Sequence, residues 1–243
     1  MRDVVDSPAS GPGGQVIFEN ISLARGGRPV FDRLSLTLRE RRIGLIGNNG
    51  SGKSTLLRLI AGLVPADSGT IRVGGVEVGR ERPNTGFLFQ NPDHQILFPT
   101  VGEEVAFGLT ARGVQSRKAD AAARALLAEH GCAGWEKRAV HELSEGQKQL
   151  VCLIAVLAPG PDLLLLDEPF SSLDLPTRYD LSRRLDGLGQ TVLMASHDLE
   201  LLAGFDRVLW LDGGRVRGDG PPDSVIAAYR AHVRAGQDRA QTA

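Results

Sequence analysis

The sequence is poor in cysteine, lysine and aromatic residues, and it has no long apolar run. Its two cysteines, Cys132 and Cys152, lack the spacing of metal ligands, so we interpret them as reduced thiols of a cytoplasmic protein. The longest apolar stretch, residues 150–158, covers nine positions and stops at Pro159. A helix needs about 20 apolar residues to cross a bilayer. We therefore expect a soluble protein that meets a membrane only through a partner.

The chain also lacks an excess of either charge. Its net charge is −1 at pH 7, and its arginines are scattered along the sequence. Surfaces that bind nucleic acid are usually strongly basic, so we expect no nucleic acid partner. Residues 1–14 have no apolar segment of the signal-peptide kind and are expected to form a disordered tail. The rest predicts a single domain over residues 15–235, followed by a C-terminal tail over 236–243.

A glycine-rich segment that holds one of only four lysines is the most informative feature present. Residues 47–54 (GNNGSGKS) fit the phosphate-binding pattern G-x-x-x-x-G-K-[ST]. Glycines let backbone N–H groups curl around a triphosphate, and the helix that follows directs its positive dipole end at the anion. The alternative, a glycine-rich hairpin turn, is disfavoured because residues 43–46 read as a buried strand and residues 55–61 as an amphipathic helix. The predicted ATP-binding residues are Gly47, Asn48, Asn49, Gly50, Ser51, Gly52, Lys53, Ser54 and Thr55.

Hydrophobic periodicity predicts an α/β fold with three parts. We expect a parallel α/β core, a β-rich N-terminal lobe of antiparallel hairpins, and a helical insert over about residues 91–160. Capping boxes begin two helices of the insert, at Thr100 and Ser144. The expected strands cover 16–23, 30–38, 43–46, 70–73, 76–78, 87–89, 163–166, 192–195 and 207–211. The expected helices cover 55–61, 100–109, 117–130, 144–157, 176–188 and 221–233.

Two acidic residues follow a strand of four leucines, residues 163–166. They emerge at the C-terminal end of the strand, where parallel α/β sheets bind ligands. Asp167 suits Mg²⁺ coordination together with the hydroxyl of Ser54. Glu168 suits activation of the water that attacks the γ-phosphate, which Lys53 is placed to reach. The alternative is a strand end that exposes two acids to solvent.

The order of these motifs resembles the ATP-binding-cassette (ABC) ATPases, a class of P-loop NTPases, over about residues 16–220. The matching segments are 47–54, Gln90, 143–147, 163–168, 171–174 and His197. The resemblance implies two subunits that face head to tail, with each ATP between one P-loop and the signature loop of the other subunit. The residues support that role, because Ser144 is a helix N-cap and Gly146 lets the backbone approach a phosphate.

The resemblance also implies roles for single residues. Gln90 would sense Mg²⁺ and the attacking water, and His197 would contact the γ-phosphate. Asp174 would lie in the D-loop, which connects the two sites. The predicted catalytic residues are thus Glu168, His197, Gln90 and Lys53, the magnesium residues are Ser54, Gln90 and Asp167, and the residues supplied in trans are Ser144, Gly146 and Gln147.

Two positions depart from the family pattern. ABC ATPases usually stack an aromatic ring on adenine ahead of the P-loop, but the matching place, Ala24–Arg25, has none. Arg25 offers its guanidinium plane instead. Glu145 replaces the usual glycine of the signature loop, where its charge either slows closure on a triphosphate or complements the helix N-terminus.

Residues 89–108 (FQNPDHQILFPTVGEEVAFG) are similar to the ATPases of energy-coupling-factor (ECF) importers, which take up vitamins and transition-metal ions. This similarity implies a homodimer on the cytoplasmic face of the cell membrane, bound to a transmembrane coupling protein and a substrate-binding membrane protein. It also implies a groove for arginines of coupling helices, with Asp93 as the first acidic candidate and Glu103 and Glu104 in reserve. Residues 40–47 look most like biotin-uptake members, with cobalt and nickel members nearly as good a match. The sequence does not decide whether the transported solute is biotin, cobalt or nickel.

Two other functions are alternatives to an importer. A soluble ABC-type clamp or assembly factor would use the same ATPase without a transporter, but the chain shows no basic face for a nucleic acid. A small-molecule P-loop kinase leaves the signature residues 143–147 and His197 unexplained.

Overall fold

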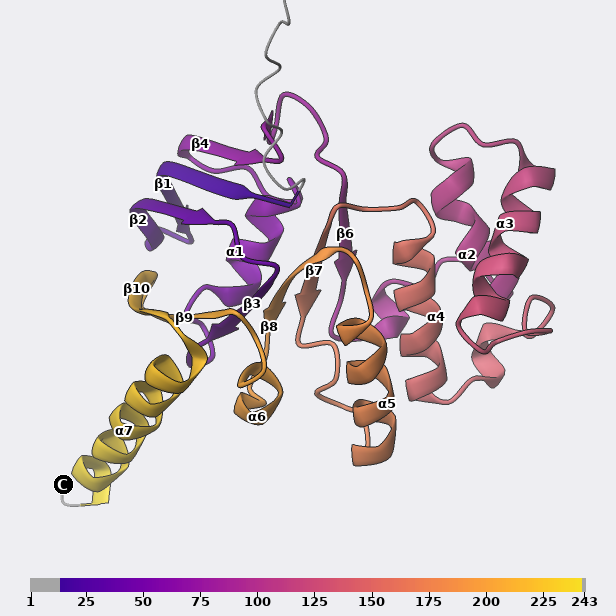
Figure 1. Cartoon of the computed structure of the whole chain (residues 1–243). Helices are drawn as coiled ribbons and strands as arrows, with labels where there is room; N and C mark the ends of the chain where they lie inside the picture. The colour runs from indigo at the N-terminus through magenta and orange to yellow at the C-terminus, as the bar shows by residue number, and fades with distance from the viewer. Residues whose placement is uncertain (1–13, 242–243) are drawn as a thin grey trace, which may run out of the picture.

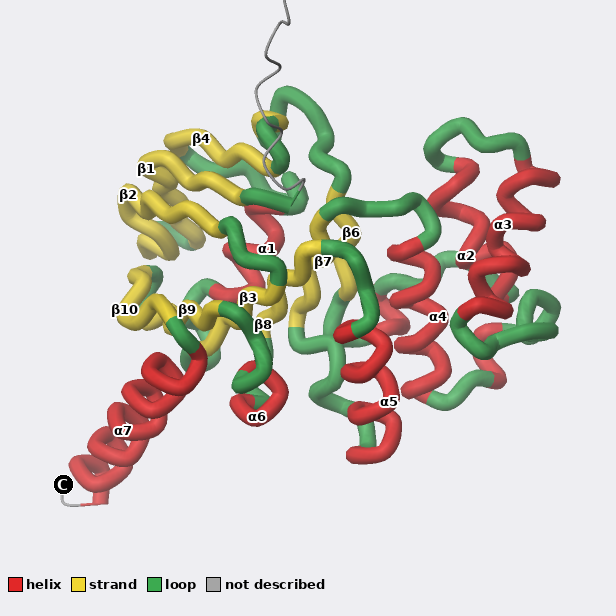
Figure 2. Tube along the Cα trace, in the orientation of Figure 1, coloured by secondary structure: helices red, strands yellow, loops and turns green. Residues whose placement is uncertain are grey.

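The computed structural model describes the backbone of residues 14–241 and the side chains up to residue 236. The expected N-terminal tail, apart from Gly14, lies outside the described residues. Figures 1 and 2 show a central sheet, a smaller sheet on one side of it, and a group of helices on the other. This arrangement confirms the predicted α/β core with a β-rich lobe and a helical subdomain.

The central sheet has six strands in the order β10-β9-β3-β8-β7-β6. All neighbours from β9 to β6 run parallel, and β10 pairs antiparallel with β9 at the edge. Strand β10 was not expected, because its sequence (RVRGDG) has no apolar alternation. The strands are β3 (Arg42–Ile46), β6 (Thr85–Leu88), β7 (Leu163–Asp167), β8 (Thr191–Ala195), β9 (Arg207–Asp212) and β10 (Arg215–Gly220).

The smaller sheet is antiparallel, as predicted, in the order β2-β1-β4-β5. Its alternating apolar residues are buried while their neighbours face solvent. Its strands are β1 (Val16–Arg25), β2 (Arg28–Leu38), β4 (Ser68–Val73) and β5 (Val76–Glu77).

Alternate residues of the central strands enter two separate cores. In β7, Leu163 and Leu165 pack with helix α1 (Lys53–Ile60) and the antiparallel sheet. Leu164 and Leu166 pack with the helices of the opposite face. Successive strand side chains point to opposite faces. A run of four leucines is therefore what a strand covered on both faces requires.

The helical subdomain contains α2 (Val101–Thr110), α3 (Ser116–Glu129) and α4 (Glu145–Leu157), and α2 contacts both of the others. Both predicted N-caps are present: the Thr100 hydroxyl accepts the Glu103 N–H, and Ser144 forms both bonds of a capping box with Gln147. Two short 3-10 helices, η1 (Pro92–His94) and η2 (Val140–Glu142), flank these helices.

Three further helices follow the central strands: α5 (Leu175–Asp186), α6 (Leu199–Leu202) and α7 (Pro222–Gln241). The one-turn α6 was not expected, because four residues are too few for a helical period to show. Helix α7 continues to Gln241, past Val233 and through most of the tail expected over 236–243. Figure 1 shows α7 projecting away from the central sheet.

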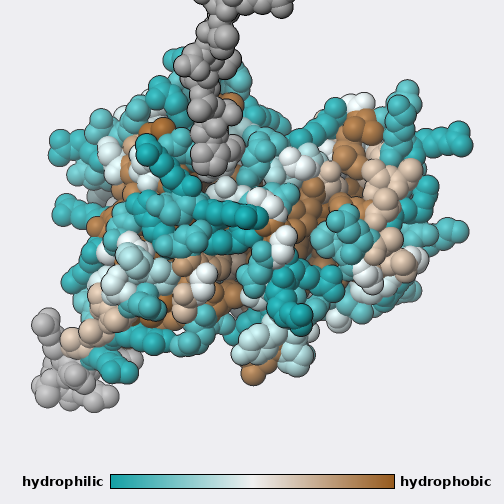
Figure 3. All heavy atoms as spheres, viewed as in Figure 1, coloured by the Kyte–Doolittle hydropathy of each residue, from teal (hydrophilic) through white to brown (hydrophobic). Residues whose placement is uncertain are grey.

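The surface in Figure 3 is mainly hydrophilic, with apolar patches between the strands and the helical subdomain. Among the residues whose side chains are described, the large apolar ones that are exposed are Leu63, Leu97, Phe107, Leu175 and Tyr179. Both cysteines are free and buried. Among the described helices, none combines the length and the apolar character that a membrane crossing requires.

Candidate functional site

The P-loop connects β3 to α1 at the C-terminal end of the central strands, where the sequence places it. Gly47 has a φ of 145°, and a Cβ there would collide with the Leu211 carbonyl oxygen. Only glycine therefore suits this position. The Ser51 hydroxyl oxygen is buried in the loop and has no hydrogen-bond partner within the described part of the chain. A buried polar atom without a partner fits a loop built to receive phosphate oxygens.

Lys53 lies folded into the loop, with only 5% of its surface exposed. Its Nζ donates to the carbonyl oxygens of Gly47 at 2.8 Å and of Asn48 at 3.3 Å. Burial lowers the pKa of its ammonium group, and the nearby carboxylates of Glu168 and Asp167 act in the opposite direction. A cation held in this way is available to a phosphate that displaces the two carbonyls.

The two predicted magnesium ligands lie together. The Ser54 hydroxyl donates to Asp167 Oδ1 at 2.8 Å, although 113 positions separate the residues. Asp167 is buried at the end of β7, and its Oδ2 lies 3.8 Å from Arg58 Nη2 of helix α1. A serine hydroxyl and a carboxylate are oxygen ligands of the kind that Mg²⁺ prefers. The residues present thus fit a magnesium ion next to the P-loop.

The side chains of Glu168 and His197 are in contact at the ends of β7 and β8. His197 Nε2 lies 2.9 Å from Glu168 Oε1, and the Glu168 backbone N–H donates to the Ala195 carbonyl oxygen. Glu168 has a φ of 50°, in the left-handed region that side-chain-bearing residues rarely adopt. Such backbone strain is common at catalytic sites. The structure therefore brings together the two residues that the sequence assigned to the γ-phosphate.

Gln90 reaches the same site through a serine. Its Nε2 donates to Ser171 Oγ at 3.1 Å, and Ser171 Oγ donates to the Glu168 carbonyl oxygen at 3.2 Å. Ser171 belongs to the segment 171–174 of the family pattern, but the sequence predicts no separate role for it. It links the predicted Q-loop to the segment that holds the predicted base.

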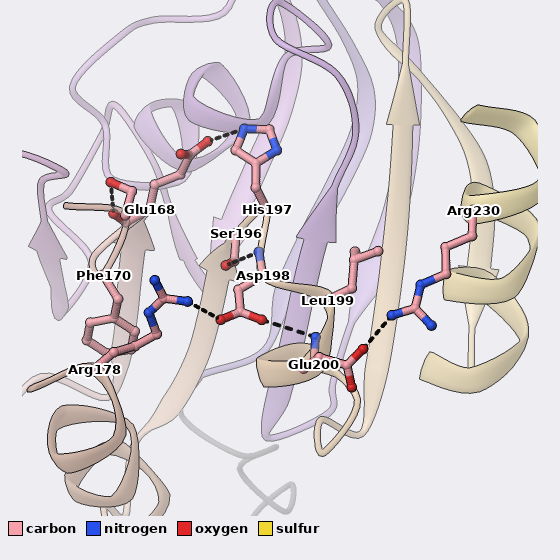
Figure 4. Close-up of a pocket in the computed structure, with 10 residues that line it drawn as sticks. Glu168, Phe170, Arg178, Ser196, His197, Asp198, Leu199, Glu200 and Arg230 are labelled. Atoms are coloured by element: carbon pink, nitrogen blue, oxygen red, sulfur yellow. Dashed lines mark hydrogen bonds and ion pairs between the residues drawn. The ribbon is translucent and has the colours of Figure 1, made fainter. Parts of the chain in front are cut away.

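A cavity of about 510 Å³ opens beside Glu168 and His197 (Figure 4). Arg178 of α5 crosses it and pairs with Asp198 at 2.8 Å. Asp198 also caps α6 by accepting the backbone N–H groups of Glu200 and Leu201. The cavity therefore opens beside the predicted catalytic residues, and the segment that carries His197 forms part of its wall.

The predicted signature residues sit at the start of α4, near the start of α5. A Cβ on Gly146 would collide with the Thr177 side chain of α5. Within this chain, Gly146 thus serves close helix packing, a role that differs from the predicted approach to a phosphate. Asp174 caps α5 by accepting the Thr177 N–H at 3.1 Å, and the hydrogen bonds from Thr177 lower the pKa of its carboxyl. The trans roles of Ser144, Gly146 and Gln147, and the D-loop role of Asp174, stay predictions.

The three acidic candidates for a partner groove differ in exposure. Asp93 is 64% exposed and pairs with Lys148 of α4 at 2.6 Å. Glu103 is exposed beside Thr100. Glu104 is only 5% exposed, because its Oε2 accepts the backbone N–H groups of Leu97 and Phe98. Glu104 is therefore a loop anchor, and its expected reserve role in the groove does not fit the structure.

Arg25, the candidate for adenine stacking, is exposed at the end of β1, and its role stays a prediction. The sequence missed Tyr229 of α7, whose hydroxyl donates to Asn48 Oδ1 of the P-loop at 3.3 Å. Burial and, to a smaller extent, Asp212 raise the pKa of this phenol. No local pattern could have revealed the contact, because 181 positions separate its two residues.

The site has the features of an ATPase of the cassette class. A P-loop lies at the end of a parallel sheet, and its serine contacts a buried aspartate. A glutamate and a histidine lie together at the ends of the neighbouring strands. The family model for ABC transporters matches residues 31–171, and the chain belongs to this family. It is therefore an ATP-binding protein and an ATPase, as its motifs predict.

Three comparisons place the chain within this family. It is 51% identical over 220 residues to the biotin transport ATP-binding protein BioM of Rhodobacter capsulatus, covering 89% of this chain and 94% of that protein. It is 36% identical over 211 residues to the energy-coupling factor transporter ATP-binding protein EcfA2 of Methanospirillum hungatei, covering 82% of this chain and 53% of that protein. The structure of cbiO1 from Clostridium perfringens, part of the ABC transporter complex cbiONQ, matches with a TM-score of 0.77 at 25% identity, covering 91% and 94% of the two chains.

Proposed function

We propose that this chain is the energy-coupling ATPase of an ECF-type importer for biotin, and that it acts as a homodimer on the cytoplasmic face of the membrane. The proposal of an importer, and of biotin as its solute, rests on the 51% identity to BioM over almost the whole length of both chains. The likeness to EcfA2 and to cbiO1 supports the ECF class. The runner-up, a soluble clamp, has no specific observation in its favour.

The chemistry that we propose is transfer of the γ-phosphoryl group of ATP to water. The P-loop N–H groups and Lys53 would hold the phosphates, and Ser54 and Asp167 would hold Mg²⁺, with Gln90 as a further candidate. Bound Mg²⁺ offsets the negative charge of the β- and γ-phosphate oxygens. Positioning and electrostatic stabilisation supply most of the catalysis in such reactions.

Glu168 is the proposed general base, and His197 its proposed companion. The carboxylate takes a proton from water as the water oxygen attacks the γ-phosphorus. The bond from the γ-phosphorus to the bridging oxygen breaks, leaving ADP and phosphate. The 2.9 Å contact between Glu168 and His197 supports the assignment, because it places the His197 imidazole directly beside the proposed base.

The arrangement of α1 and α4 supports the proposed homodimer. The two helices pack on opposite faces of the central sheet, in separate cores (Figure 1). The fold therefore does not bring the signature loop at the start of α4 to the chain's own P-loop. A second subunit in head-to-tail orientation would supply Ser144 to the γ-phosphate.

Asp93 is the proposed contact for a basic coupling helix of the membrane partner. It is the exposed acid of η1, and its present partner, Lys148, lies on the helix that begins with the signature loop. An arginine that docks at Asp93 competes with Lys148 and so acts directly on α4. Exposed ion pairs contribute little net stability, which makes such an exchange easy.

The experiment that tests this function is transport by the complete complex. The tagged chain, purified from membranes, is expected to bring a stoichiometric multi-span protein with it. Vesicles that hold this complex should accumulate labelled biotin when supplied with MgATP, and the matched complex with Glu168→Gln should not. If the vesicles accumulate cobalt or nickel instead, that ion replaces biotin as the proposed solute. If the chain is isolated without any membrane protein, the soluble clamp is favoured.

A further inference from the structure

One buried amide in the helical subdomain touches the neighbours of two predicted catalytic residues. Gln149 lies in the second turn of α4 and is 1% exposed. The residues that follow it in the helix are apolar and mostly buried. Its Oε1 is buried without a hydrogen-bond partner among the described residues. A buried polar atom without a partner lowers the stability of the folded protein, which offsets part of what the other hydrogen bonds of this amide contribute.

The amide nitrogen of Gln149 makes two hydrogen bonds to backbone. Its Nε2 donates to the Pro169 carbonyl oxygen at 2.8 Å and to the Phe89 carbonyl oxygen at 3.3 Å. Pro169 directly follows Glu168, and Phe89 directly precedes Gln90. A single side chain of α4 is thus bonded to both loops that present the predicted base and the predicted Q-loop glutamine.

The backbone of Phe89 is held from its other side as well. Its N–H donates to Gln95 Oε1 at 3.1 Å, and Gln95 Nε2 lies 3.4 Å from the Cys152 carbonyl oxygen of α4. Two glutamine side chains therefore fix the residue before Gln90 to the same helix. Gln90 in turn bonds Ser171, which bonds the Glu168 carbonyl oxygen. These contacts form one continuous network from α4 to Glu168.

We propose that Gln149 is a positioning residue for ATP hydrolysis, because it ties α4 to the loops of Gln90 and Glu168. The inference rests on the proposed roles of those two residues and goes beyond them. Any rotation of the helical subdomain moves the start of α4, and Gln149 passes that movement to both loops at once. Helix α1, which follows the P-loop, packs in the other core, so we expect ATP binding at the P-loop to depend little on Gln149.

Steady-state ATP hydrolysis by the full chain tests this role. Gln149→Met keeps the length of the side chain and removes both donors. We expect kcat to fall about tenfold or more while the KM for MgATP changes less than twofold. Val151→Ala is the matched control, because Val151 is equally buried on α4 and takes part in none of these hydrogen bonds. It should lower the melting temperature at least as much as Gln149→Met and leave kcat near the wild-type value.

The contrary results are distinct. A kcat for Gln149→Met within twofold of wild type, or an equal loss of kcat in Val151→Ala, would overturn the proposal. Should Gln149→Met fail to fold, Gln95→Met decides in its place, because it releases Phe89 from the other side and should also lower kcat at constant KM. Glu168→Gln, measured in parallel, separates the two proposals. Normal hydrolysis by that variant would refute the catalytic assignment, whereas an inactive Glu168→Gln beside a fully active Gln149→Met refutes only the positioning role.

Discussion

Two serines of the P-loop differ in what their hydroxyl groups contact. Ser54 donates to Asp167, whereas the hydroxyl oxygen of Ser51 is buried at 4% exposure without a partner in the described chain. The first bond stabilises the free protein. The Ser51 hydroxyl has lost its contacts with water without gaining a partner, so it lowers the stability of the ligand-free protein. The same residue type therefore has opposite effects on stability three positions apart.

Ser51→Ala is expected to stabilise the nucleotide-free protein by about 0.5–1 kcal/mol, because it removes a buried group that has no partner. It should also weaken MgATP binding by roughly threefold to tenfold, the equivalent of one hydrogen bond. Urea unfolding without nucleotide and equilibrium binding of a fluorescent ATP analogue measure the two effects.

Ser54→Ala is the matched control for that experiment. It leaves Asp167 without its donor, so the free protein should become less stable, the opposite sign to Ser51→Ala. If both variants destabilise the free protein equally, the Ser51 hydroxyl has a hydrogen-bond partner in the free protein, contrary to this prediction.

At the scale of elements, helices α4 and α5 pack closely because Gly146 has no Cβ atom. A Cβ on Gly146 would meet Thr177, which is also the residue whose backbone N–H is bonded by the helix cap Asp174. The starts of the two helices are therefore in close contact. Two predicted inter-subunit elements, the signature loop and the D-loop, are fixed to each other within one chain.

Gly146→Ala should destabilise the protein by about 1–3 kcal/mol, because it overpacks this junction. Thr177→Ser removes the colliding methyl group and keeps the backbone bond to Asp174, so the double variant should regain more than half of the loss. Thermal unfolding of the wild type, both single variants and the double variant gives the comparison. Unchanged stability of Gly146→Ala would instead favour the role that the sequence first suggested, close approach to a phosphate.

The features that could be predicted from the sequence are those that a few consecutive residues determine. The P-loop, the capping box at Ser144 and the leucine strand β7 each follow from a few consecutive residues. What escaped prediction depends on contacts between distant positions. The burial of Glu104 needs the path of the preceding loop, and the bonds of Gln149 need β6 and β7 in place. Strand β10 is specified by its pairing with β9, since its own sequence lacks an apolar pattern.

At the scale of the whole molecule, Arg207 joins the two sheets. From β9 it donates to both Asp219 carboxylate oxygens, to the Thr37 carbonyl oxygen of β2, and to Glu40. Burial acts to raise the pKa of the Glu40 carboxyl, but hydrogen bonds from the backbone N–H groups of Arg39 and of Glu40 itself, and from Arg207, hold it below its usual value. The orientation of the antiparallel sheet thus depends partly on an ionised glutamate.

The stabilising effect of Glu40 should depend on pH. Because its pKa is lowered in the folded state, its contribution is complete above about pH 4.5, the ordinary value, and is lost as the pH falls through the lower folded value. The difference in unfolding free energy between wild type and Glu40→Gln should therefore be largest near neutral pH and shrink on acidification. Urea unfolding at several pH values measures it.

Glu81→Gln serves as the control for this series, because Glu81 is an exposed glutamate. Its difference from wild type is expected to stay small at every pH. A difference for Glu40→Gln that grows on acidification would contradict the assignment of Glu40 as an ionised partner of Arg207.

The contact between His197 and Glu168 also affects the rate of ATP hydrolysis that we expect from a subunit on its own. A carboxylate oxygen in close contact with an imidazole nitrogen is less accessible to a water molecule that must give it a proton. On the proposed assignment of Glu168 as the base, a single subunit should therefore hydrolyse ATP slowly until another group engages the imidazole. On that assignment, ATP is hydrolysed mainly after the complete site has assembled, so little is used before then.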